Sequence, residues 1–172
     1  MLKNLFVMES EFTLDAIDWQ LLDLLQRNAQ LTNQELAALV HVSPPTCLRR
    51  VRRLHASGLI ERQVALLQPD RLAALQGQGL SAIVEVSLDR QGAEHLDAFE
   101  ARAVADDAVQ QCWRVSPGPD FVLVVHTRDM PGYLALSQRL FTQDANVRNV
   151  KAFFATRRAK FETKLPVVLA AQ

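Results

Sequence analysis

The chain has few of the features that mark disulfide-rich, membrane-spanning or strongly charged proteins. Only two of its 172 residues are cysteines, Cys47 and Cys112, and their wide separation excludes a disulfide framework and a CxxC metal motif. The longest apolar runs fall short of the roughly 18 residues that a membrane span needs. The opening "MLKNLFVMES" has too short an apolar part for a secretory signal. We therefore expect a cytoplasmic protein with reduced thiols and no membrane partner.

Residues that would indicate catalysis are also missing. The four histidines are scattered, with no HExxH motif and no metal-ligand spacing, and no glycine-rich loop of the phosphate-binding type occurs. Asp106 and Asp107 are adjacent carboxylates, but they fall between an expected helix and an expected strand, where a solvated role is more common. The sequence predicts a protein that is not an enzyme and that has no catalytic residues, metal site or cofactor.

The net charge is zero, but its distribution is uneven. Residues 41–62 contain five arginines and a single acid, Glu61, and a local basic patch matters more for phosphate binding than the total charge. Within it, "SPPTCLRRVRRL" (43–54) begins with a possible N-cap, Ser43, and a proline suited to the first helical turn. We expect a helix here that ends near Gly58, where glycine favours the left-handed cap.

Helical periodicity divides this segment into two faces. The side expected to be buried holds Cys47, Leu48, Val51, Leu54 and His55. The opposite side holds Thr46, Arg49, Arg50 and Arg53, with Arg52 at its flank. A solvated helix face would normally include glutamates paired with the arginines, and this strip has none. The strip is therefore expected to bind an external anion, with DNA favoured over a solvated face, RNA or a protein.

Two more amphipathic helices precede the basic one. They are expected over residues 15–28 and from about Asn33 to Val40, where Thr32 and Glu35 have the spacing of a capping box. Three short helices with a tight turn before the last describe a helix-turn-helix unit. Its packing is expected to use Leu36, Leu39, Val42, Leu48, Val51 and Leu54. Cys47 is interpreted as a small core residue.

The rest of the chain predicts a βαββαβ order. A strand over residues 59–69 and a short linker to residue 79 lead into it. Strands are expected at 80–88, 109–116, 120–127 and 147–158, and helices at 92–104 and 131–141. Such an order forms a four-stranded antiparallel sheet with both helices on one face. Nothing else in the chain could cover the other face, so we expect a second copy to cover it.

These stretches together resemble the Lrp/AsnC (feast/famine) family of transcription regulators. The resemblance rests on "LDAIDWQLLDLLQRNAQLTNQELA", "VSPPTCLRRVRRLHASGLI", "ALLQP", "RDMPGY" and "KFETKLP". It implies an α+β chain with an N-terminal winged-type helix-turn-helix domain and a C-terminal ferredoxin-like (RAM/ACT-like) βαββαβ domain. The expected divisions are an N-terminal extension (1–13), the DNA-binding domain (14–58), a hinge strand and linker (59–79), the effector-binding and oligomerisation domain (80–158) and a tail (159–172). It also implies dimers, often assembled into octamers, and an amino-acid effector.

A recognition helix places its N-terminal residues at base edges in the major groove. The expected DNA-binding residues are Asn33, Gln34, Ser43, Pro44, Thr46, Arg49, Arg50, Arg52 and Arg53. Of these, Arg49 and Arg53 lie one turn apart and could each bond a guanine, whereas Arg50 and Arg52 at the edges are expected to contact phosphates.

The resemblance places the effector near the turn "VSPGPDF" (115–121). The expected effector-binding residues are Ser116, Gly118, Asp120, Met130, Phe153 and Phe154. Pro117 stands where the family usually has glycine, and with Pro119 it removes two backbone N–H donors that could hold a carboxylate. This departure puts the usual pose of an amino-acid effector in question, and a rigid turn with Asp120 in an ordinary structural role is an equal alternative.

Two further functions stay open from the sequence. The chain could be an amino-acid-binding module without DNA binding, although the arginine strip argues against this. It could also be an architectural protein that wraps DNA with low sequence specificity at the nucleoid. A sequence-specific transcription regulator controlled by a small molecule is the main prediction.

Overall fold

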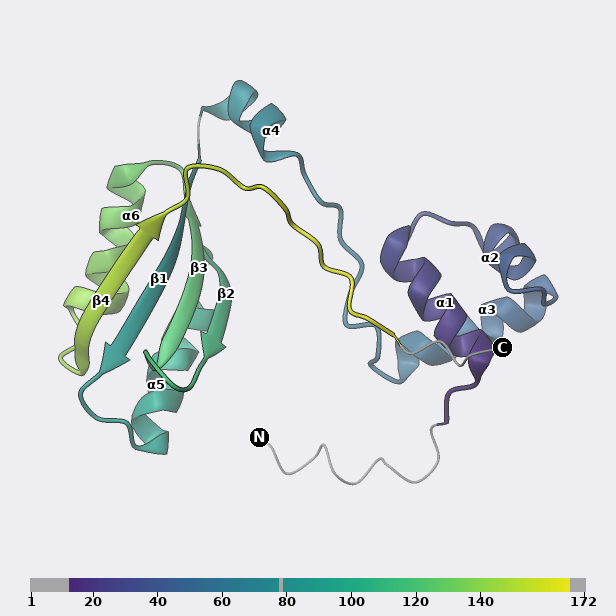
Figure 1. Ribbon diagram of the computed structural model, residues 1–172, viewed down its shortest axis with the longest axis horizontal. Helices are drawn as coiled ribbons and strands as arrows, with labels where there is room; N and C mark the ends of the chain where they lie inside the picture. The colour runs from purple at the N-terminus through teal and green to yellow at the C-terminus, as the bar shows by residue number, and fades with distance from the viewer. Residues whose placement is uncertain (1–12, 78, 168–172) are drawn as a thin grey trace. The chain divides into compact units, whose positions relative to one another are not determined.

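The computed structural model describes residues 13–77 and 79–167 and divides the chain into two compact units (Figure 1). The first unit joins the segment that ends at Ala65 to the C-terminal segment that starts at Lys160. The second unit covers Leu66–Ala159. Residues 1–12, all but the last residue of the expected extension (1–13), lie outside the described residues.

The first unit contains three helices whose ends are fixed by local hydrogen bonds. They are α1 (Ala16–Arg27), α2 (Asn33–Leu39) and α3 (Pro44–Ala56). The Thr32–Glu35 capping box is confirmed at the start of α2: the Thr32 N–H donates to Glu35, and the Glu35 N–H donates to the Thr32 hydroxyl. A second capping box, Asp15 with Asp18, begins α1. The expected glycine at the end of α3 is also confirmed, because Gly58 has a φ of 78°.

The helices bury one shared core. Its fully or largely buried side chains are Leu21, Leu22, Leu36, Ala37, Val40, Cys47 and Leu54, with Val42 and Val51 packed against them. Each buried leucine or valine among them stabilises the unit by about 1.5–3 kcal/mol. The prediction is wrong for two leucines: Leu39 is 53% exposed and Leu48 is 39% exposed. Leu39 is the last residue of α2, and Leu48 directly follows the completely buried Cys47, so helical periodicity assigns both to the packed side although each stays exposed.

The segment between the basic helix and the sheet differs from the expectation. Residues 61–68 form neither helix nor strand, and α4 (Pro69–Gln76) follows. The predicted hinge strand is therefore not formed within the single chain, because a strand needs a neighbour for its N–H and C=O groups. Within the described part of the first unit there is no strand at all, so the winged variant of the helix-turn-helix is not present there.

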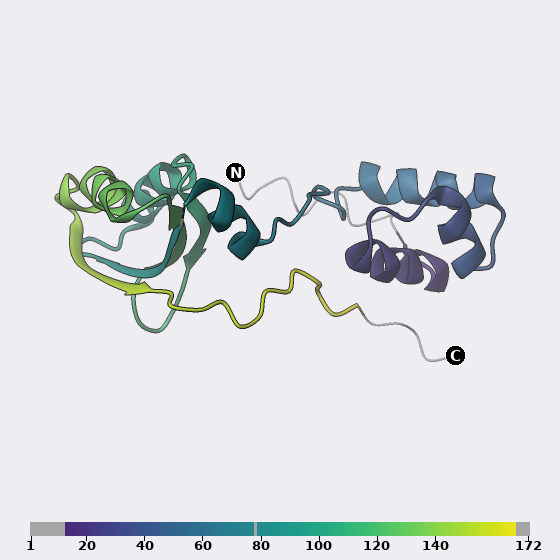
Figure 2. The same ribbon diagram turned by 90° about the horizontal axis from the view of Figure 1, so that it is seen from above.

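The second unit is a sheet covered by two helices on one face (Figure 2). The strands β1 (Leu80–Leu88), β2 (Val109–Arg114), β3 (Phe121–Thr127) and β4 (Val147–Phe154) lie in the order β2-β3-β1-β4, with every neighbouring pair antiparallel. The helices α5 (Ala93–Val104) and α6 (Met130–Ser137) complete the expected βαββαβ order, and a π-helical turn at Gln138–Thr142 extends α6. The ferredoxin-like arrangement predicted from the sequence is confirmed.

Alternation along the strands separates a buried face from an exposed one. Under the helices, Val84, Val86 and Leu88 of β1 are fully buried, and the Phe99 and Phe121 rings lie 4.8 Å apart. On the other face, paired positions place Ile83 between Val124 and Phe153, and place Trp113 opposite Val122. Ile83, Trp113 and Phe153 are each about half exposed. We call Ile83, Trp113, Val122, Val124 and Phe153 the apolar sheet patch.

The C-terminal segment belongs to the helical unit and contacts α1. Lys164 Nζ lies 2.5 Å from Asp23 Oδ1. The Gln26 side chain accepts a hydrogen bond from the Leu165 N–H (2.7 Å) and donates one to the Leu165 carbonyl (3.2 Å). Residues from both ends of the chain therefore build the first unit.

Candidate nucleic-acid interface and effector region

The arginines of α3 are divided between two environments. Arg49 and Arg52 are exposed, and neither forms an ion pair with any residue that the structure describes. The opposite side of the same helix buries Cys47 and Leu54 in the core. The packing of α3 thus places Arg49 and Arg52 on the outside of the unit. Their N–H groups form no ion pair with the described residues.

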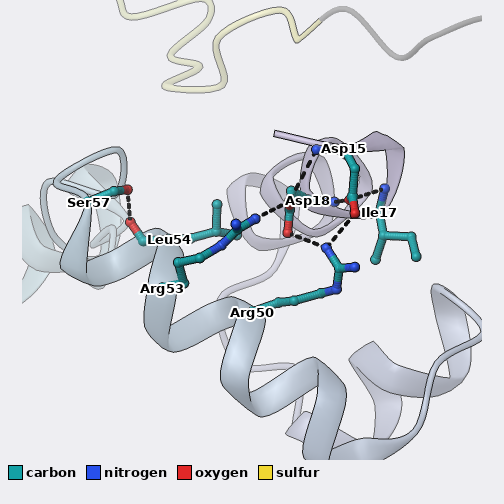
Figure 3. A network of polar contacts seen from close by, with 7 residues as sticks. All are labelled: Asp15, Ile17, Asp18, Arg50, Arg53, Leu54 and Ser57. Atoms are coloured by element: carbon teal, nitrogen blue, oxygen red, sulfur yellow. Dashed lines mark hydrogen bonds and ion pairs between the residues drawn. The ribbon is translucent and has the colours of Figure 1, made fainter. Parts of the chain in front are cut away.

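Arg50 and Arg53 are held by carboxylates at the start of α1, the N-cap residue Asp15 and Asp18 (Figure 3). Arg50 Nη1 lies 2.9 Å from Asp18 Oδ1 and 2.8 Å from Asp15 Oδ2, and Arg53 Nη2 bonds the other oxygen of Asp18. Asp18 is completely buried, whereas the Arg50 side chain is 18% exposed. The sequence indicates no internal partner for the strip, and the structure adds one: two of its four arginines pair with carboxylates of the protein, while the binding of an external anion stays a prediction.

The contacts within this network favour the charged forms of Arg50 and Asp15. The hydrogen bond to Asp18 raises the pKa of Arg50 against the opposing effect of burial. Burial alone would raise the pKa of Asp15, but the Asp18 N–H and the Arg50 guanidinium together hold it below its ordinary value. The Asp15 and Asp18 carboxylates lie against Arg50 and Arg53, so they offset part of the positive charge on this surface.

A shallow hollow of about 200 Å³ borders the network. It is lined by Thr13, Leu14, Asp15, Arg49, Arg50 and Arg53. Three arginines and one carboxylate face a space of this size, which suits an anionic group such as a DNA phosphate.

The leading end of α3 holds the remaining predicted DNA-binding residues. Ser43 is the N-cap residue, but its hydroxyl donates to the Thr46 hydroxyl (2.9 Å) and bonds no backbone N–H of the helix. The Asn33 side-chain amide donates to the Pro44 carbonyl (2.8 Å), so it joins α2 to the start of α3. Gln34 is exposed beside it. Asn33 is thus engaged within the protein, whereas Gln34 is accessible.

In the sheet unit, Asp120 forms hydrogen bonds with the backbone of β1. Its carboxylate accepts a hydrogen bond from the Leu88 N–H (2.7 Å), and its own N–H donates to the Val86 carbonyl (2.9 Å). The Ser116–Pro117 peptide is cis, and Gly118 has a φ of 127°. The turn joins β2 to β3, and the two hydrogen bonds of Asp120 attach it to β1.

A hollow of about 420 Å³ lies beside this turn. Its lining residues are Gln91, Leu96, Arg114, Val115, Ser116 and Asp120. Arg114 bonds Asp97 (2.7 Å) and Glu100 (2.6 Å) of α5, and these hydrogen bonds raise its pKa. Of the predicted effector residues, only Ser116 and Asp120 line this hollow.

The other predicted effector residues lie elsewhere in the sheet unit. Met130 begins α6 and is exposed. Phe154 packs edge-on against Tyr133 of α6, with ring centroids 4.9 Å apart, whereas Phe153 belongs to the apolar sheet patch. The prediction that Phe153 and Phe154 point to opposite faces is confirmed, so the two cannot line one pocket of a single chain.

Sequence reasoning missed the acidic partners of the basic helix. Asp15 and Asp18 have a three-residue spacing typical of a capping box, but their contacts with α3 span more than 30 residues and no local signal reports them. Lys164 and Asp23 were missed for the same reason. Within residues 13–77 and 79–167, no three His, Cys, Asp or Glu side chains form a group suited to a metal ion. No helix of that part is long and apolar enough to cross a membrane.

Comparison with known proteins agrees with both units. The family model of the AsnC-type helix-turn-helix domain matches residues 14–55, and that of the Lrp/AsnC ligand binding domain matches residues 81–165. The chain is 36% identical over 147 residues to the leucine-responsive regulatory protein of Rhizobium meliloti, covering 86% of this chain and 92% of the relative. It is 31% identical over 154 residues to the DNA-binding transcriptional activator DecR of Escherichia coli K12, covering 90% and 99% of the two chains.

A solved structure gives the same assignment. A transcriptional regulator of Neisseria meningitidis in complex with L-Met has a TM-score of 0.78 and 30% identity, and the similarity covers 90% of this chain and 97% of that one. The helix-turn-helix unit, the βαββαβ unit and these similarities lead to one conclusion: the chain belongs to the Lrp/AsnC family of transcription regulators.

Proposed function

We propose that this regulator binds duplex DNA with the leading half of α3 in the major groove. The observation that carries the proposal is the exposure of Arg49 and Arg52, whose donors have no partner among the described residues. A guanidinium with unoccupied N–H groups can bond O6 and N7 of guanine. Arg49, nearer the N-terminus of α3, is the proposed base-reading residue, and Arg52 the proposed phosphate contact.

The neighbouring residues fit supporting roles. Thr46, Ser43 and Pro44 lie at the end of α3 that enters a groove first. Gln34 is placed to donate to the DNA backbone. Asn33 supports α3 through its bond to Pro44, and Arg50 and Arg53, which line the hollow with Arg49, are held there by Asp18.

Fluorescence anisotropy tests this proposal directly. Wild-type protein is titrated into the DNA upstream of its own gene and into a scrambled duplex of equal length, over a salt series. We expect tighter binding to the upstream DNA and a steep fall of log affinity with log salt. Equal affinity for both duplexes would favour an architectural role, and no binding at low salt would overturn the proposal.

We propose further that an amino-acid effector binds the sheet unit beside the 115–120 turn. The ligand binding domain matched over residues 81–165 and the L-Met complex of the Neisseria meningitidis regulator support this. The 420 Å³ hollow is of suitable size, and Asp120 could pair with an ammonium group. Pro117 and Pro119 cannot donate to the carboxylate, so the effector must use other donors.

Asp120→Asn separates a ligand role from a structural one. Asparagine keeps an oxygen for the Leu88 N–H but removes the negative charge. We expect unchanged basal DNA binding and a weakened response to amino acids, measured by anisotropy with each amino acid added. Identical ligand titrations for the variant and the wild type would exclude Asp120 from the effector site.

We propose that a second copy of the chain covers the apolar sheet patch, giving at least a dimer. An exposed face of Ile83, Trp113, Val124 and Phe153 is unusual for a monomer and suits a self-complementary contact. A two-fold assembly would also present two copies of α3, as paired half-sites require. Further assembly to octamers is part of the same proposal. Because its proposed target is DNA, we place the protein in the cytoplasm at the nucleoid and propose no catalytic activity.

A further inference from the structure

Asp18 contacts two of the four arginines of the recognition helix. Its two carboxylate oxygens are divided between them, Oδ1 to Arg50 and Oδ2 to Arg53. It has no exposed surface, so its position is fixed by the core of the unit and does not depend on what the helix binds.

This contact determines how many N–H donors Arg50 and Arg53 have available for a base. Bidentate recognition of guanine needs two N–H groups of one guanidinium edge. In Arg50, Nη1 is occupied by Asp15 and Asp18, and Nε is buried without a partner. Arg53 has Nη2 bonded to Asp18. The two arginines are therefore directed toward α1, while the donors of Arg49 and Arg52 have no partner in the described part of the chain.

The same contact reduces the charge that any duplex would meet. Arg49, Arg50, Arg52 and Arg53 supply four positive charges, and Asp15 and Asp18 offset two of them. Sequence-independent binding depends on the number of phosphates neutralised, whereas base reading depends on a few oriented donors. A carboxylate that restrains two arginines thus lowers affinity for random DNA more than affinity for the correct site.

We infer that Asp18 is a positioning residue that sets the sequence discrimination of this regulator by restraining Arg50 and Arg53 and leaving base reading to Arg49. The inference rests on the proposed DNA-binding function. It assigns to α1 a role in specificity, although α1 itself contacts no base in this scheme.

The test compares Asp18→Asn, Asp15→Asn and Asp23→Asn with the wild type. Asp15→Asn is a milder change, because asparagine is an equally good N-cap and Arg50 keeps its bond to Asp18. Asp23→Asn is the matched control: Asp23 is also a largely buried aspartate of α1, but it pairs with Arg27 and Lys164 and not with α3. Each variant is titrated against a duplex enriched by the wild type from a random pool, and against the unselected pool, over a salt series.

For Asp18→Asn we expect affinity for the unselected pool to rise about tenfold and the log–log salt slope to steepen by about 1–2, because two guanidinium groups gain access to phosphates. Discrimination between the two duplexes should fall correspondingly. Asp15→Asn should shift both quantities in the same direction by less, and Asp23→Asn should shift neither.

Thermal unfolding of each variant separates these effects from a loss of fold. A folded Asp18→Asn protein with wild-type slope and discrimination would overturn the inference and leave Asp18 as a structural link between α1 and α3. Should Asp18→Asn not fold, Asp15→Asn decides the question, with an unchanged slope overturning the inference. A wild type that binds neither duplex would instead overturn the proposed function.

Discussion

Arg50 and Asp18 are 32 positions apart in the chain, and their side chains meet at 2.9 Å between α3 and α1. This ion pair links the helix that is expected to enter DNA to the first helix of the unit. It also separates arginines that maintain the fold from arginines that are available to a ligand.

Arg49 and Arg50 should therefore respond differently to replacement by alanine. Arg49→Ala should weaken binding to the selected duplex by about 1–3 kcal/mol with unchanged stability, because an exposed side chain is lost. Arg50→Ala should lower the free energy of unfolding by about 2–3 kcal/mol, because the buried Asp18 carboxylate loses one of its two cationic partners. Anisotropy and urea unfolding measure the two quantities, and equal losses of affinity at unchanged stability would contradict the distinction.

The apolar sheet patch should control assembly. Ile83→Glu places a charge between Val124 and Phe153, so burying this face against a second copy would become unfavourable. We expect the variant to be a monomer in size-exclusion chromatography with light scattering. Val104→Glu, which adds a charge at an exposed position of α5, is the control and should retain the dimer. A dimeric Ile83→Glu protein would show that another surface joins the chains.

The contact between α1 and the C-terminal segment should depend on pH. The hydrogen bond from Lys164, opposed by burial and aided by Arg27, lowers the pKa of Asp23. A carboxyl group whose pKa is lower in the folded state stabilises that state above its unfolded pKa, and the effect is lost as pH falls through the folded value. The contact should thus be intact at neutral pH and disappear below the usual aspartate value of 3.8.

An NMR titration of the Leu165 amide follows this transition. Its N–H is bonded to Gln26, one turn from Asp23, and should shift with the Asp23 carboxyl group. In Lys164→Gln the midpoint should move up toward the ordinary aspartate value. The same midpoint in both proteins would show that Lys164 does not hold Asp23 in solution.

The two thiols should differ in reactivity. Cys47 is completely buried, and burial raises the pKa of its thiol. Burial also raises the pKa of Cys112, with a further contribution from Glu100, but Cys112 is partly exposed. Since the thiolate is the reactive form, a disulfide reagent at pH 8 should modify Cys112 slowly and Cys47 only as fast as the unit unfolds. Cys112→Ser isolates Cys47, and rapid modification of that variant would contradict its role in the core.

The sequence predicted features that depend on nearby residues better than those that depend on distant ones. The Thr32–Glu35 cap, the proline start of α3, the Gly58 end and the βαββαβ order follow from spacings of a few residues, and the structure contains all of them. Side chains over 59–69 favour a strand, but a strand also needs a partner, and the residues that the structure describes provide none for this segment.

The residues of the candidate DNA-binding surface show the same limit: contacts with distant residues cannot be predicted from local sequence. Periodicity placed Arg50 and Arg53 on an outer face, and only the packing of α1 against α3 shows that Asp18 reaches them. Leu48 directly follows Cys47, which is completely buried, yet Leu48 itself is 39% exposed, so the width of the packed face of α3 depends on the neighbouring helices and not on the periodic pattern alone.

The contact of Lys164 and Leu165 with α1 also has a consequence for the order of events during synthesis. A ribosome makes α1, α2 and α3 first and the segment from Lys160 onward last. The helical unit therefore emerges with Asp23 and Gln26 lacking these partners, and it acquires them only after every strand of the sheet has been translated. Only a chain that extends through Leu165 can carry this contact, so a product that stops before it would differ at α1 itself.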